Sequence, residues 1–196
     1  MSDIQLLLTT MQIVTIRPLR LGDVPSIDTM HDRVSKESLY SRYFTAHKPS
    51  LNSLFEQANL SSSKGSAFVA ALQSPEQEIV GLAYYIFKPE DMCVAEPALL
   101  IEDRFQGQGL GKVMMECLMR EAQAHLVSYF KIFVLPANQR VLRILEQSKL
   151  PMERHYRDGL FEVWQYLDNG NCIANSACKE ISTIGGELDS AIPVGA

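Results

Sequence analysis

Residues 104–115, RFQGQGLGKVMM, place glycines at the alternate positions 107, 109 and 111, directly after an apolar run and directly before helix-favouring residues. Glycine tolerates positive φ and close approach of other groups, so this spacing indicates a tight turn with a bare backbone. Apolar residues then recur at helical spacing and predict a helix over about residues 108–126. The first N–H groups of a helix lack internal partners and favour an anion, so the turn could hold a phosphate.

Two common nucleotide motifs do not fit this loop. A dinucleotide fingerprint would need a glycine where the chain has Lys112, and a P-loop would need Ser or Thr where it has Val113. Two alternatives remain. One is a turn that binds nothing, and the other is a cradle whose glycines let a pyrophosphate approach the helix.

The rest of the chain alternates strand and helix patterns. Strands are predicted at residues 13–19, 67–72, 78–87, 93–103 and 129–135, with Pro75 in a hairpin turn and a closing hairpin over 153–167 that turns at 157–159. Helices are predicted after Asp23 and Ser35 as N-caps, over residues 50–60, and over residues 137–148. Residues 61–66 are predicted to be a loop. The strand–helix–strand order after residue 93 requires a parallel pair within an otherwise antiparallel sheet.

Composition narrows the function classes. The 196 residues suit one domain, and a net charge of −5 gives no basic footprint for nucleic acid. No apolar run approaches the roughly 20 residues of a membrane helix, and the four cysteines form no C-x-x-C pair, so we expect a reducing cytoplasm. We expect residues 1–12 to be an extension, 13–167 the folded domain, and the glycine-containing, aromatic-free residues 168–196 a mobile or surface-draped tail.

Several stretches resemble one family. Gln106-x-x-Gly109-x-Gly111, after a strand that ends at Ile101, resembles the acetyl-CoA pyrophosphate loop of the GNAT N-acetyltransferases. TIRPLRLGDVPSI (15–27) and NQRVLRILEQ (138–147) resemble the first strand with its helix and a later helix of that family. SKESLYSRYF (35–44) and AEPALLIEDRFQGQGLG (95–111) are similar to its bacterial protein-lysine acetyltransferase branch.

The resemblance implies a fold, a reaction and a binding site. The implied fold class is α/β (α+β), a GNAT fold whose mixed central sheet has antiparallel N-terminal strands, a parallel pair splayed at the acetyl-CoA cleft, and helices on both faces. The implied reaction is direct attack of an amine on acetyl-CoA. We expect no metal in the site, and a monomer and a homodimer both stay open. The acetyl-CoA contacts that it implies are Leu99, Leu100, Ile101, Gln106, Gly107, Gln108, Gly109, Leu110, Gly111, Lys112 and Asn138, the last of which could instead be only a helix cap.

The acceptor and the catalytic base are the remaining expectations. A protein lysine is the leading acceptor; the alternatives are a small amine, or a non-catalytic sensor of acyl-CoA. An amine with a pKa near 10 is about 99.9% protonated at neutral pH, so a base is required. The AE-x-A pattern of the branch makes Glu96 that base, and an apolar strand face shared with Ala98 and Leu100 would favour proton acceptance there. Glu102 on the same face is the second candidate, and a solvated or Arg-paired Glu96 is the alternative.

Two departures from the family pattern bear on catalysis. Pro97 removes an N–H from the strand and predicts an edge or a bulge. Leu145 occupies the position where many GNAT enzymes have a proton-donating Tyr, and Tyr40 and Tyr156 are only remote substitutes. The SLYSRYF segment (38–44) places aromatic residues and Arg42 where acceptors enter this fold, although core packing would also explain it.

Overall fold

The computed structural model describes residues 3–45, 47–48, 64–74, 77–88 and 91–167. Within them, the strands form one sheet of order β1-β2-β3-β4-β5-β6-β8-β7, in which β5 and β6 are the parallel pair. The strands are β1 Ile4–Leu7, β2 Ile13–Pro18, β3 Gly65–Leu72, β4 Ile79–Lys88, β5 Asp91–Ile101, β6 Tyr129–Val134, β7 Met152–Arg157 and β8 Leu160–Tyr166. The predicted mixed sheet is therefore confirmed.

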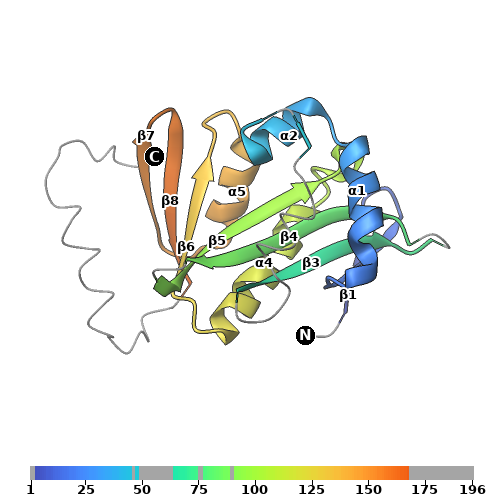
Figure 1. Ribbon diagram of the computed structural model, residues 1–196, viewed down its shortest axis with the longest axis horizontal. Coiled ribbons are helices and arrows are strands. Elements are labelled where there is room, and N and C mark those ends of the chain that lie inside the picture. Colours follow the sequence, from blue (N-terminus) through green and yellow to red (C-terminus); the bar gives the residue numbers. More distant parts are fainter. Residues whose placement is uncertain (1–2, 46, 49–63, 75–76, 89–90, 168–196) are drawn as a thin grey trace, which may run out of the picture.

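Helices cover both faces of this sheet, as the resemblance implies. They are α1 Val24–Arg33, α2 Lys36–Tyr43, α4 Leu110–Ala124 and α5 Gln139–Gln147, with 3₁₀ turns at Leu21–Asp23 and Asp103–Phe105. Figure 1 shows α4 passing behind β3 and β4, on the side of the sheet away from α1. The buried side chains divide accordingly: those of α1 and α2 pack on one face of β3–β5, and those of α4 and α5 pack on the other.

Two expectations need correction, and three others are not tested. Strand β1, which pairs antiparallel with β2, lies in the expected N-terminal extension and was not predicted. Gly65 belongs to β3 and not to a loop, and it must be glycine because a Cβ there would lie 2.1 Å from the Tyr85 carbonyl oxygen. The predicted helix at residues 50–60, the hairpin position Pro75 and the tail lie outside the described residues.

The two predicted helix caps behave differently. Ser35 is confirmed, since its hydroxyl accepts a hydrogen bond from the Ser38 N–H at 3.2 Å. Asp23 stands at the N-cap position of α1 but makes no side-chain cap there. Its buried carboxylate instead pairs with Arg17 at 2.7 Å and accepts the Arg20 N–H at 2.7 Å, which fixes the turn before the helix.

The imidazole of His31 joins α1 to α2. It is 1% exposed, its Nδ1 lies 2.8 Å from the Ile27 carbonyl oxygen, and its Nε2 lies 2.8 Å from the Tyr43 hydroxyl. Burial lowers the pKa of His31 below its ordinary value, although the hydrogen bond to Ile27 acts in the opposite direction. The neutral ring therefore donates from Nδ1 and accepts at Nε2.

The lowered pKa of His31 predicts a pH-dependent stability. Below about pH 6.5 the unfolded chain binds a proton at this residue that the folded chain does not, so the free energy of unfolding should fall as the pH falls, by up to about 1.4 kcal/mol per pH unit. Urea unfolding between pH 7.5 and 5.5 measures this slope. The variant His31→Gln should show a flatter slope, and an unchanged slope would contradict the assignment.

Candidate active site

The site opens where β5 and β6 separate. The parallel pair is in register only at Val94 with Tyr129 and at Ala95 with Phe130, whereas β4 stays paired with β5 as far as Ile101. Figure 1 shows the two strands diverging beyond that point. A cleft of about 1330 Å³ fills the gap, lined by residues of α2, β4, β5, β6, α4 and α5.

The strand register identifies which backbone groups face the cleft. The Glu102 N–H donates to the Val80 carbonyl at 3.0 Å, and alternate residues of an antiparallel pair bond to the same partner. The backbone groups of Glu96, Ala98 and Leu100 therefore bond to β4, and those of Pro97, Leu99 and Ile101 face the cleft. Leu100 lines the cleft, but its backbone is directed to β4, so the backbone pairing predicted for Leu100 does not fit.

Leu99 is the position with both backbone groups free for a ligand. Pro97 has no N–H, and the Ile101 carbonyl already accepts a hydrogen bond from the Gln106 side chain at 2.8 Å. No described strand pairs with the Leu99 N–H and C=O on the side of the cleft. A ligand that lies along β5 would therefore pair mainly with this residue, in the manner of an added strand.

The glycines after β5 have two different structural roles. Gly107 and Gly109 have φ of +74° and +84°, and a Cβ at either would meet no atom within 4 Å, so both leave open space beside the start of α4. Gly111 has a packing role, because a Cβ there would lie 3.0 Å from Ile144 Cδ1 and 3.2 Å from Ile101 Cδ1. Leu110 is fully buried, so only its backbone could meet a ligand.

The two glutamines of the loop hold its shape. Gln106 donates from Nε2 to the Ile101 carbonyl and to Ser38 Oγ at 3.0 Å, and its Oε1 accepts from Arg140. Gln108 Oε1 accepts from Thr9 Oγ1 at 3.1 Å, and its Nε2 donates to the Arg104 carbonyl. These side chains fasten the loop to its surroundings, so the groups open to a ligand are those of the backbone.

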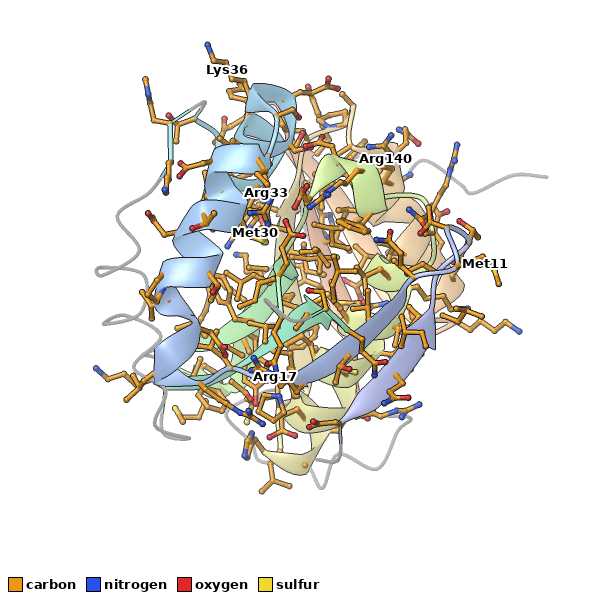
Figure 2. The ribbon with its side chains drawn as sticks, turned by 90° about the vertical axis from the view of Figure 1, so that its right-hand side faces the viewer. Met11, Arg17, Met30, Arg33, Lys36 and Arg140 are labelled. Atoms are coloured by element: carbon orange, nitrogen blue, oxygen red, sulfur yellow. The ribbon has the colours of Figure 1, made fainter. Side chains whose placement is uncertain are left out.

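Cationic side chains stand at this end of the cleft. Lys112, Arg140 and Arg143 line it, and none of them forms a salt bridge with another described residue. In Figure 2, Arg140 lies at the same end of the molecule as α2. The two arginines are not among the contacts expected from the sequence, although their three-residue spacing after Asn138 places them on one side of α5. Asn138 caps α5, its Oδ1 accepting the Val141 N–H at 3.3 Å.

Glu96 lies in the cleft, but not in the apolar setting that the strand pattern predicts. Its side chain is 49% exposed, and its Oε1 lies 3.4 Å from Lys88 Nζ. Glu102, the second candidate base, is wrong for that role. Its carboxylate is 4% exposed and is bound by Arg33 at 2.9 Å and by Arg104, which makes it part of a structural ion network.

The position of the missing tyrosine is part of the core. Leu145 is fully buried, and its carbonyl accepts a hydrogen bond from Gln165 Nε2 at 3.2 Å. Tyr40 and Tyr156 are exposed and do not line the cleft. The hydroxyls that do line it are those of Ser38, Ser41 and Tyr84.

A known family shares these features: the order of elements, the separation of β5 from β6, and the accessible N-terminus of α4. Residues 14–150 match the sequence model of the acetyltransferase (GNAT) domain. The chain belongs to the GNAT acetyltransferase family. It is therefore an acyltransferase, and acetyl-CoA is the co-substrate that its cleft has to accommodate.

Solved structures of this family share the fold at low sequence identity. The GNAT domain of S. lividans PAT superimposes with a TM-score of 0.71 at 21% identity, over 84% of this chain and 96% of that one. For yncA of Salmonella typhimurium, solved with its cofactor acetyl-CoA, the TM-score is 0.65 at 15% identity, over 83% and 98% of the chains. For spermidine N-acetyltransferase from Vibrio cholerae, solved with CoA and spermine, the TM-score is 0.60 at 18% identity, over 79% and 95%.

The cleft suits the co-substrate of a GNAT acetyltransferase. Its volume of about 1330 Å³ exceeds the roughly 300–1,000 Å³ of ordinary small-molecule pockets, leaving room for a long donor and an acceptor. The described residues contain no cluster of three or more His, Cys, Asp or Glu side chains suited to a metal. None of the described helices is long and apolar enough to cross a bilayer.

The open space at Gly109 predicts a selective loss of CoA binding. Gly109→Ala should weaken CoA at least about 10-fold, or 1.4 kcal/mol, because a methyl group would enter the space beside the helix start. Gly159→Ala is the matched control, since Gly159 has a similar φ of +81° and open surroundings but lies in the β7–β8 turn. Both variants should lose about 1–2 kcal/mol of stability. If calorimetry gives the same CoA affinity for Gly109→Ala and Gly159→Ala, the prediction that the glycine loop binds the pyrophosphate of CoA is contradicted.

Proposed function

We propose that the chain transfers an acetyl group from acetyl-CoA to the side-chain amine of a protein lysine, with Glu96 as the general base. The observation that carries the proposal is the position of Glu96 in the cleft, one residue beyond Ala95, the last residue of β5 that pairs with β6. A carboxylate at this point stands where the strand edge becomes available to a ligand. It is also accessible to an acceptor, because half of its surface is exposed.

Different residues around the cleft would bind the donor and deprotonate the acceptor. Bound acetyl-CoA supplies the activated acetyl thioester. The backbone of Leu99 would orient it along β5, and the N–H groups at the start of α4, with Lys112 and Arg140, would bind its phosphates. Glu96 Oε2 has no hydrogen-bond partner among the described residues and would take the proton from the acceptor amine.

The charge of the cleft favours an amine with a single charge over a polyamine. Acidic groups are needed to bind several ammonium groups, and few are available here, because Glu96 already lies beside Lys88 and Asp103 already accepts two serine hydroxyls. The acidic lining residues are Glu37, Glu96 and Asp103, and the cationic ones are Arg42, Lys88, Lys112, Lys131, Arg140 and Arg143. Asp103 is further occupied by Ser35 and Ser38, at 2.7 Å from each hydroxyl. These features support a protein lysine in preference to spermidine.

The non-catalytic alternative is favoured by one observation, the buried Leu145 in place of a proton donor. A thiol with an ordinary pKa near 8.5 can, however, leave without an acid. Release of free CoA thiol with and without acceptors separates the alternatives. Binding of acetyl-CoA without release would support a sensor.

Replacement of Glu96 by Gln tests the catalytic base. The amide keeps the shape but cannot accept the proton, so kcat should fall by about 10²- to 10⁴-fold while the Kd for acetyl-CoA changes little. Glu37→Gln removes another exposed carboxylate from the same cleft and should keep activity within about threefold. Retention of activity by Glu96→Gln within about threefold would reject the assignment.

Competition between acceptors tests the substrate class. A folded acyl-CoA synthetase domain with a reactive lysine should be acetylated with a higher kcat/KM than spermidine, because the cleft has few groups that could hold a polycation. Mass spectrometry of the lysine marks, together with thiol release, gives both rates. A higher kcat/KM with spermidine than with the synthetase domain would show that the enzyme acetylates small amines.

A further inference from the structure

Arg42 is held rigidly at the edge of the cleft. Its guanidinium carbon lies 4.8 Å from the centre of the Tyr43 ring and 5.2 Å from that of Tyr84. Its Nη2 also donates a hydrogen bond to the Tyr84 hydroxyl. Stacking on two rings and one hydrogen bond together fix the plane of the guanidinium.

Hydrogen bonds behind Tyr43 keep its ring in place against Arg42. The Tyr43 hydroxyl donates to Nε2 of the buried His31, whose Nδ1 donates to the Ile27 carbonyl, each at 2.8 Å. The His31 and Tyr43 rings also stack at 5.9 Å between centres. The side-chain entropy of the arginine is therefore largely lost before any ligand binds, which favours tight recognition.

Arg42 stands on the side of the sheet where the base is. In the β4–β5 register Tyr84 is opposite Ala98, and Ile86 is opposite Glu96, so alternation puts these side chains on one face. That face is covered by α1 and α2. The loop and the helices α4 and α5, with Lys112 and Arg140, belong to the other face. Arg42 is thus placed to meet the acceptor and not the phosphates of the donor.

Most of the hydrogen-bonding capacity of Arg42 is unused. A guanidinium carries five N–H donors, and the bond to Tyr84 is its one hydrogen bond with a side chain among the described residues. No described carboxylate forms a salt bridge with it, although Glu37 lies on the same helix. A fixed, unpaired guanidinium in a cleft matches the two oxygens of a carboxylate.

We propose that Arg42 is a specificity-determining residue that binds a carboxylate of the acceptor, held near the amine that Glu96 deprotonates. The inference rests on the proposed acetyl transfer and narrows its acceptor class. The carboxylate could come from an acidic residue beside the target lysine in a protein or from the α-carboxylate of a free amino acid. The chemistry at Arg42 is the same in both cases.

Paired acceptors that differ only in this group provide the test. The first pair is a lysine peptide with Glu beside the lysine and the same peptide with Gln there; the second is free lysine and lysinamide. Initial rates of thiol release give kcat/KM for each. The wild type should prefer the carboxylate member of at least one pair by about 10- to 100-fold, the range of a charge-assisted hydrogen bond, and the pair that shows the preference identifies the source.

Variants connect the preference to Arg42. Arg42→Met should reduce the preference to about one while the rate with the amide acceptor and the Kd for acetyl-CoA stay within about threefold. Arg42→Lys keeps the charge without the planar fork and should retain a small part of the preference. Lys36→Met is the matched control. It removes a cation from the same helix, but the Lys36 side chain points outward from α2 and does not line the cleft (Figure 2).

The outcomes separate this inference from the proposed function. Equal rates with carboxylate and amide acceptors in the wild type would overturn the role of Arg42 and leave acetyl transfer standing. A preference that survives Arg42→Met in a folded variant, judged by an unchanged acetyl-CoA Kd, would overturn it as well. Transfer to none of the four acceptors, together with no transfer to the folded synthetase domain, would overturn both. Loss of the preference in Arg42→Met but not in Lys36→Met would support the carboxylate site.

Discussion

The site depends on the unequal pairing of β5. On one side β4 pairs with it as far as Ile101, and on the other β6 pairs with it only at Val94 and Ala95. Pairing with β4 on one side keeps β5 in its strand conformation. Its other edge retains backbone N–H and C=O groups without a strand partner, which would cost free energy if they were buried without a ligand or water. The cleft, the free groups of Leu99 and the position of Glu96 all follow from this one departure from regular pairing.

The elements around the opening are tied together by side chains that bind no ligand themselves. Gln106 connects β5 with α2 and α5, and Gln108 connects the glycine loop with the turn between β1 and β2. Gly111 lets α4 approach both Ile101 and Ile144. A loop that is hydrogen-bonded to these neighbouring elements presents its N–H groups in a constant arrangement, so less ordering is required when a phosphate binds.

In the proposed reaction the two substrates bind from different faces of the sheet. The glycine loop, Lys112 and the arginines of α5 belong to the face of α4, where an anionic donor would bind. Glu96, Tyr84 and Arg42 belong to the face covered by α1 and α2, where an acceptor would enter. The two sets meet at the open edge of β5, where groups from both faces line the same cleft.

The sequence by itself determined the order of the described helices and strands from β2 onward, the mixed sheet and the glycine loop. Short-range rules govern these features: a two-residue period for strands, a 3.6-residue period for α4, and positive φ at Gly107 and Gly109. Only the tertiary structure decided what each polar side chain does. Glu96 faces Lys88, Glu102 serves an ion network with Arg33, and Arg42 lies between two tyrosines, one of them from a distant strand. Partners so far apart along the chain leave no periodic signal, and charge and burial at a site depend on those partners.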